Sequence, residues 1–86
     1  MPLRLHPDVT MAVTDDGAVL LHQRTGRYWQ LNNTGVLVLR GLLDGDSPEQ
    51  TADALVDRHR ADLADARRDV SALVDGLRAA QLLREV

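Results

Sequence analysis

The sequence predicts a small α+β protein in which a three-stranded antiparallel sheet is followed by three helices. In the first third of the chain, apolar and polar residues alternate, and two short turn signals interrupt the alternation. In the rest of the chain, apolar residues recur at helical spacing, and helix-start signals divide them into separate runs. Because the chain has 86 residues, we expect a single domain over residues 1–86.

The three strands of the sheet are expected at residues 9–14, 18–23 and 27–31. In the first strand, one face carries Val9, Met11 and Val13. The sequence TDDG at 14–17 is typical of a hairpin, and RTGR at 24–27 indicates a second turn. Because both connections are short, the strands run antiparallel to their neighbours. The segment LRL at 3–5 can extend along the side of this sheet, although nearby prolines limit its pairing.

The first two helices have clear start signals. Asn32 suits an N-cap, and Gly45 suits the end of the helix that follows. Apolar residues at helical spacing in this helix are Val36, Leu39, Leu42 and Leu43. The sequence SPEQ at 47–50 is a capping box with proline at the first helical position, and it predicts a helix that ends near His59. The residues that this second helix directs inward are Ala52, Leu55 and Val56.

The third helix is predicted to begin at Asp62 or Asp65. Its apolar stripe consists of Ala66, Val70, Leu73, Val74, Leu77 and Ala80. Gly76 interrupts this helix at a cost of about 1 kcal/mol relative to alanine. The glycine therefore indicates close approach of another backbone, a packing contact inside the domain, or a tolerated weak position.

Composition excludes several kinds of chemistry. The chain has no cysteine, and none of its three histidines has a second histidine at i+3 or i+4, as helical metal sites commonly do. There is no glycine-rich phosphate loop. We therefore expect no cofactor, no metal and no enzymatic activity. The net charge of −3 argues against nucleic acid as a partner, and no segment is long enough to span a membrane. We expect a cytoplasmic protein.

The only tyrosine and the only tryptophan are neighbours in the third strand. Adjacent strand residues point to opposite faces, so Trp29 shares its face with Leu31 and is the better core residue. Tyr28 then lies on the face of Gln30, either as cover for the sheet or as part of a binding groove. In a simple meander this strand is an edge, protected only by the charge of Arg27, and it can accept an extended peptide as a further strand.

The run DDGAVLLHQRTGRYWQLNNTGVLVLRGLLDG at 15–45 is similar to the PqqD-like peptide chaperones. The resemblance continues through SPEQTADALVDRH and ARRDVSALVDGLRAAQLL, and it is most specific in TGRYWQLNNTG. These proteins are the recognition elements of ribosomally made, post-translationally modified peptides. The chain looks most like the discrete leader-peptide-binding proteins of lasso peptide pathways.

This resemblance implies a winged helix-turn-helix-like fold and a non-catalytic role. The leader peptide would add as a strand to residues 27–31, in the cleft beside the third helix. The implied site residues on the strand are Arg27, Tyr28, Trp29, Gln30 and Leu31. Those on the helix are Asp69, Val70, Leu73, Val74, Leu77 and Arg78, among which the sequence does not separate core from cleft. The implied further partners are a leader peptidase, which is a transglutaminase-like cysteine protease, and an ATP-dependent macrolactam synthetase.

Two other functions remain open at this point. The order of the second and third helices also suits a winged-helix DNA-binding regulator. However, the basic and acidic residues of the third helix balance, and no basic wing follows. The same edge strand and helical stripe would also suit a structural or dimerisation module.

Overall fold

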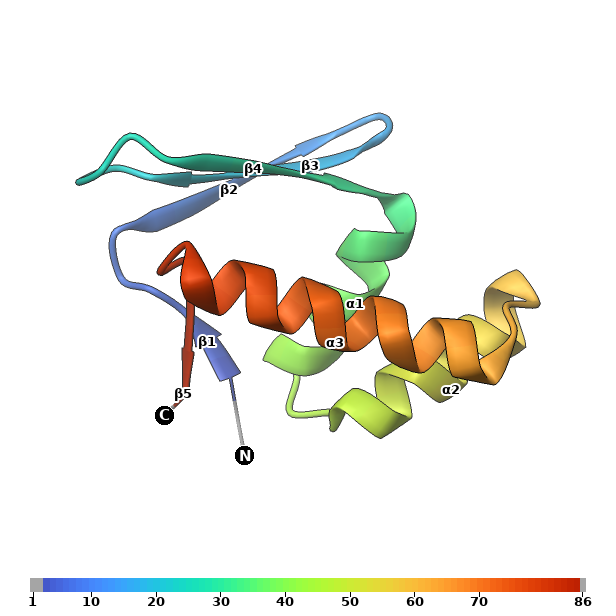
Figure 1. The fold of residues 1–86 in the computed structure, drawn as a ribbon. Helices are drawn as coiled ribbons and strands as arrows, with labels where there is room; N and C mark the ends of the chain where they lie inside the picture. Colours follow the sequence, from blue (N-terminus) through green and yellow to red (C-terminus); the bar gives the residue numbers. More distant parts are fainter. Residues whose placement is uncertain (1–2, 86) are drawn as a thin grey trace.

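The fold is described by a computed structural model over residues 3–85, so residues 1–2 and 86 of the expected domain lie outside the described residues. Figure 1 shows one sheet above a layer of helices, with a second, short pair of strands near both chain ends. The elements in chain order are β1 (Leu3–Leu5), β2 (Val9–Thr14), β3 (Gly17–His22), β4 (Tyr28–Asn32), α1 (Asn33–Leu43), α2 (Pro48–His59), α3 (Leu63–Ala79) and β5 (Leu83–Glu85). The predicted α+β class, with a three-stranded sheet before three helices, is confirmed.

The larger sheet is an antiparallel meander with the order β2-β3-β4. Gly17 lies where β3 passes close to β4, and a Cβ atom built there would lie 1.8 Å from the main-chain oxygen of Leu31. The third predicted strand begins one residue later than expected, at Tyr28, and ends at Asn32. Both predicted hairpins are present, because β2 pairs with β3 and β3 pairs with β4, each in antiparallel orientation.

The expected position of residues 3–5 is wrong. They form β1, which pairs with β5 in a separate two-stranded sheet, with Leu5 opposite Leu83. This pairing is stabilised by burial, because Leu3, Leu82 and Leu83 are all buried. Gln81, at a φ of 61°, turns the chain back after α3 toward β1.

The helices begin at the predicted caps. The Asn32 side chain accepts a hydrogen bond from the amide of Gly35 at 2.8 Å. In the capping box, Ser47 and Gln50 each accept a hydrogen bond from the other's amide. Of the two starts expected for the third helix, the structure has Asp62, which caps α3.

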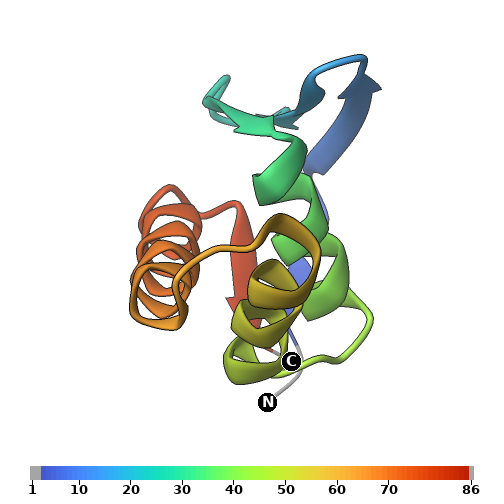
Figure 2. The same cartoon turned by 90° about the vertical axis from the view of Figure 1, so that its right-hand side faces the viewer.

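The core lies between the inner face of the larger sheet and the three helices (Figures 1 and 2). Leu20 of β3 and Leu39 of α1 are both completely buried. The two aromatic residues point to opposite faces of the sheet, as predicted. Trp29 packs against the core, while Tyr28 is 68% exposed. Trp29 is only partly buried, so it lies at the border of the core rather than within it.

Candidate functional site

The free edge of β4 presents alternate main-chain groups to solvent. His22 donates its amide hydrogen to the main-chain oxygen of Arg27 at 2.8 Å, which makes these two residues a hydrogen-bonded pair of the β3–β4 ladder. In an antiparallel ladder such pairs alternate with non-bonded pairs. The main-chain groups of Trp29 therefore face β3, whereas those of Tyr28 and Gln30 face away from the sheet.

A pocket of about 230 Å³ lies directly beside this edge, between β4, the first turns of α1, and α3. Its lining residues are Trp29, Gln30, Leu31, Asn32, Thr34, Gly35, Val38, Leu55, Asp69 and Leu73. We call this pocket, together with the free edge of β4, the β4–α3 groove. The cleft that was expected beside the third strand and the third helix thus exists as a physical feature.

The site residues expected on the third helix lie in different parts of the structure. Asp69 and Leu73 line the β4–α3 groove. Val70 and Leu77 are 1% and 0% exposed and belong to the core, and neither lines the β4–α3 groove. Val74 is also buried, at 8% exposure.

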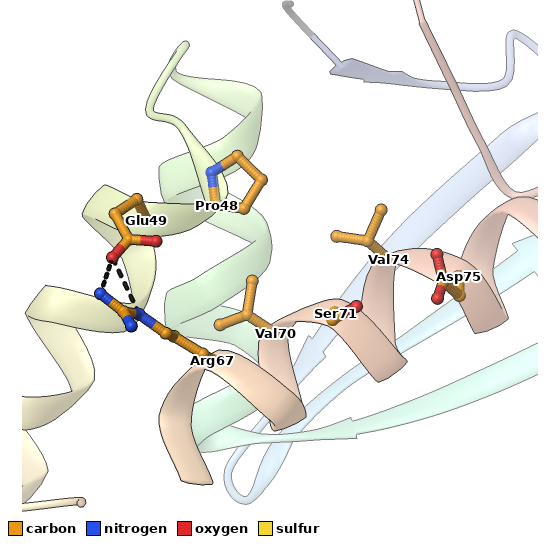
Figure 3. Close-up of a pocket in the computed structure, with 7 residues that line it drawn as sticks. All are labelled: Pro48, Glu49, Arg67, Val70, Ser71, Val74 and Asp75. Carbon is orange, nitrogen blue, oxygen red and sulfur yellow. Dashed lines mark hydrogen bonds and ion pairs between the residues drawn. The ribbon is translucent and has the colours of Figure 1, made fainter. Parts of the chain in front are cut away.

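Val70 and Val74 form the floor of a different pocket, of about 210 Å³, between α3 and the start of α2. Figure 3 shows both valines pointing toward Pro48, with Arg67 and Glu49 joined by an ion pair at the rim. The last expected residue, Arg78, forms an ion pair with Glu85 of β5. None of the three expected residues Val70, Val74 and Arg78 lines the β4–α3 groove.

Trp29 connects β4 to α3 through Gly76. A Cβ atom built on Gly76 would lie 2.8 Å from Cη2 and 3.2 Å from Cζ2 of the indole ring. Of the explanations that the sequence left open for this glycine, a packing contact inside the domain is therefore correct. The absence of a side chain lets the indole ring lie against the helix, where it forms one wall of the groove.

Sequence reasoning did not identify the part of the groove that comes from α1 and α2. Thr34, Gly35 and Val38 line it from α1, and Leu55 lines it from α2. The available signal was Asn32, because a residue that ends an edge strand and caps a helix must place that helix's first turn beside the strand. Leu55 carries no such signal, since any inward-facing leucine of the helix would fit the same pattern.

The groove is mostly uncharged. Asp69 is the only charged residue among those that line it. On the opposite face of the sheet, the exposed side chains of Tyr28 and Leu21 are cross-strand neighbours. Tyr28 therefore covers the outer sheet surface and does not line the pocket.

Within residues 3–85, no three His, Cys, Asp or Glu side chains are grouped so that they could hold a metal ion. No helix in the same part of the chain is long and apolar enough to cross a membrane.

Comparisons with known proteins match nearly the whole chain. Residues 17–83 match the family model described as coenzyme PQQ synthesis protein D (PqqD). A solved structure described as lasso peptide synthetase B1 complexed with the leader peptide is 41% identical, with a TM-score of 0.90 over 99% of this chain and 100% of that one. A second, TbiB1 in complex with the TbiA(beta) leader peptide, is 30% identical, with a TM-score of 0.84 over 96% of each chain. No curated protein sequence matches the chain.

Proposed function

The chain belongs to the PqqD family, and from this premise we propose that it binds the leader peptide of a ribosomally synthesised precursor as an added strand on β4. The observation that carries the proposal is the free edge of β4 with a pocket of mixed apolar and polar lining beside it. Both similar structures were solved with leader peptides, which supports a peptide as the ligand.

The ladder geometry determines how such a peptide would lie. The outward main-chain groups of Tyr28 and Gln30 would bond to the leader. Leader residues opposite Trp29 and Leu31 would share their face and point into the groove, because directly opposed residues lie on the same side of a sheet. Two leader side chains that are two positions apart would therefore enter the groove, while those between them would lie beside Tyr28.

Affinity and specificity would come from different parts of this site. Main-chain hydrogen bonds form with almost any peptide sequence, so specificity must come from the side chains that enter the pocket. Burial of one apolar leader side chain against Leu73 and Trp29 would contribute about 1.5–3 kcal/mol, or roughly 10- to 150-fold in the dissociation constant. Of the expected helix residues, the proposal therefore keeps Asp69 and Leu73 as direct contacts.

The proposed role is non-catalytic, and the proposed pathway is lasso peptide biosynthesis. The chain would present the bound leader to a leader peptidase and to an ATP-dependent macrolactam synthetase. The similarity of the chain to lasso peptide synthetase B1 supports this pathway. Intact-mass measurement of precursor incubated with the chain alone, with and without ATP and divalent metal, should find no cleavage and no cyclisation.

The DNA-binding alternative is not favoured by the positions of the arginines on α3. Arg67, Arg68 and Arg78 are all paired with acidic side chains of the same chain. A phosphate backbone would have to compete with these carboxylates. Titration with duplex DNA at a stated salt concentration should therefore show no specific binding.

Strand addition is tested by a substitution that removes one outward-facing amide hydrogen of β4. The leader peptide of the more similar complex is titrated against wild type, Gln30→Ala and Gln30→Pro. Proline removes an outward donor on an edge strand without removing a bond to β3, whereas alanine keeps that donor. We expect Gln30→Pro to bind about tenfold more weakly than Gln30→Ala, since one main-chain bond is lost and a leader carbonyl is left unpaired. Equal affinities for the two variants, with circular dichroism unchanged, would exclude pairing at this edge.

A further inference from the structure

The carboxylate of Asp69 has no partner of opposite charge among residues 3–85. The arginines of α3 pair with other carboxylates: Arg68 lies 3.6 Å from Asp65, Arg67 pairs with Glu49, and Arg78 pairs with Glu85. Asp69 is exposed at the groove, where every other lining residue is uncharged. The groove therefore carries one negative charge that this part of the chain does not balance.

Asp69 and Leu73 are one helical turn apart, so their side chains are neighbours on the same face of α3. Four residues of helix span about 6 Å, and two residues of an extended strand span about 6.6 Å. Figure 1 shows the axes of β4 and α3 roughly parallel across the molecule, with the two elements running in opposite chain directions. A strand on β4 would thus place two successive groove-facing side chains at the spacing of Asp69 and Leu73.

We propose that Asp69 selects peptides that carry a lysine or arginine two positions from the apolar side chain that packs on Leu73. This inference rests on the proposed function and deepens it, since it names the chemistry of the second groove-facing leader position. An ion pair at such a partly exposed position contributes modestly, so the cation should strengthen binding about two- to fivefold. The effect should decrease as salt is added.

Asp69 has another role to be separated from this one. α1 has no acidic residue in its first turn, and Thr34 and Gly35 of that turn line the same pocket as Asp69. A carboxylate near the N-terminus of a helix stabilises the helix dipole. If this were the whole role of Asp69, its replacement would lower the unfolding temperature and leave peptide selection unchanged.

The experiment is a selection of randomised 12-residue peptides, displayed on mRNA, against four forms of the full chain. These are wild type, Asp69→Asn, Asp69→Lys and the control Asp75→Asn. Asp75 is an exposed aspartate of the same helix that lines the pocket beside α2, so its replacement changes the net charge equally at another place. Selected peptides are then synthesised with lysine, norleucine or glutamate at the enriched position, and their affinities and the unfolding temperatures of all four proteins are measured.

We expect wild type and Asp75→Asn to enrich lysine or arginine two positions from an apolar residue, with lysine binding about two- to fivefold better than norleucine. Asp69→Asn should lose this preference, and Asp69→Lys should enrich glutamate or aspartate instead. An identical preference in all four proteins would overturn the proposal, whether or not Asp69→Asn unfolds at a lower temperature. Failure of wild type to select any peptide that Gln30→Pro binds more weakly would overturn the proposed function itself.

Discussion

The two sides of α3 differ in what they contact, although the sequence gives them one continuous apolar stripe. On one side, Val70 and Leu77 are packed in the core and have almost no exposed surface. On the other, Leu73 is only partly buried and lines the β4–α3 groove with Asp69. Helical periodicity therefore identifies which residues form the apolar face of a helix. The elements packed against that face determine which of these residues lie in the core and which line a pocket.

The largest expected effect lies on the core side. Leu77→Ala removes a completely buried side chain and should lower the free energy of unfolding by about 2–5 kcal/mol. The measurement is chemical denaturation followed by circular dichroism. Ser71→Ala, at an exposed position of the same helix, is the control and should change stability by no more than about 0.5 kcal/mol. A loss below about 1 kcal/mol for Leu77→Ala would contradict its assignment to the core.

A smaller effect, of a different kind, is expected on the groove side. Leu73→Asp should leave the fold intact because the side chain already contacts solvent. It should weaken leader binding at least tenfold, since it replaces the apolar surface on which a leader side chain would pack. Isothermal titration of the folded variant measures this loss. Normal binding by a folded Leu73→Asp variant would separate the pocket from the binding site.

The smallest expected effect concerns Gly76, between the two sides. Alanine favours the helix by about 1 kcal/mol, but its Cβ would lie 2.8 Å from the Trp29 ring, which must then move. We expect Gly76→Ala to change stability by less than about 1 kcal/mol and to alter the near-ultraviolet circular dichroism of the single tryptophan. Stabilisation with an unchanged tryptophan spectrum would show that the ring and the helix are not in contact.

Much of the fold could be predicted because its signals are local. Alternation, turn residues and caps lie within a few residues of the elements they define, and Asn32, Ser47 and Asp62 all cap helices as the sequence indicates. The pairing of β1 with β5 has no such signal. Each strand has three residues, and the two lie at opposite ends of the chain. Their pairing depends on leucines that are buried only after the helices have packed.

Those parts of the candidate site that depend on local sequence signals were also predictable. The two turn signals make β4 an edge, and adjacent positions in a strand place Trp29 and Tyr28 on opposite faces. The separation of Leu73 from Val70 was not predictable, because both are apolar and lie within one stripe. The same is true of Val38 and Leu55, which reach the groove only through the packing of α1 and α2.

The most direct test of the central claim is amide hydrogen exchange, resolved by residue with NMR, in the presence and absence of saturating leader peptide. The amides of Trp29 and Leu31 face β3 and should be protected in both states. The amides of Tyr28 and Gln30 face outward, so they should exchange rapidly in the free chain and become protected when the leader binds. Unchanged, rapid exchange at Tyr28 and Gln30 with the leader bound would contradict strand addition on β4.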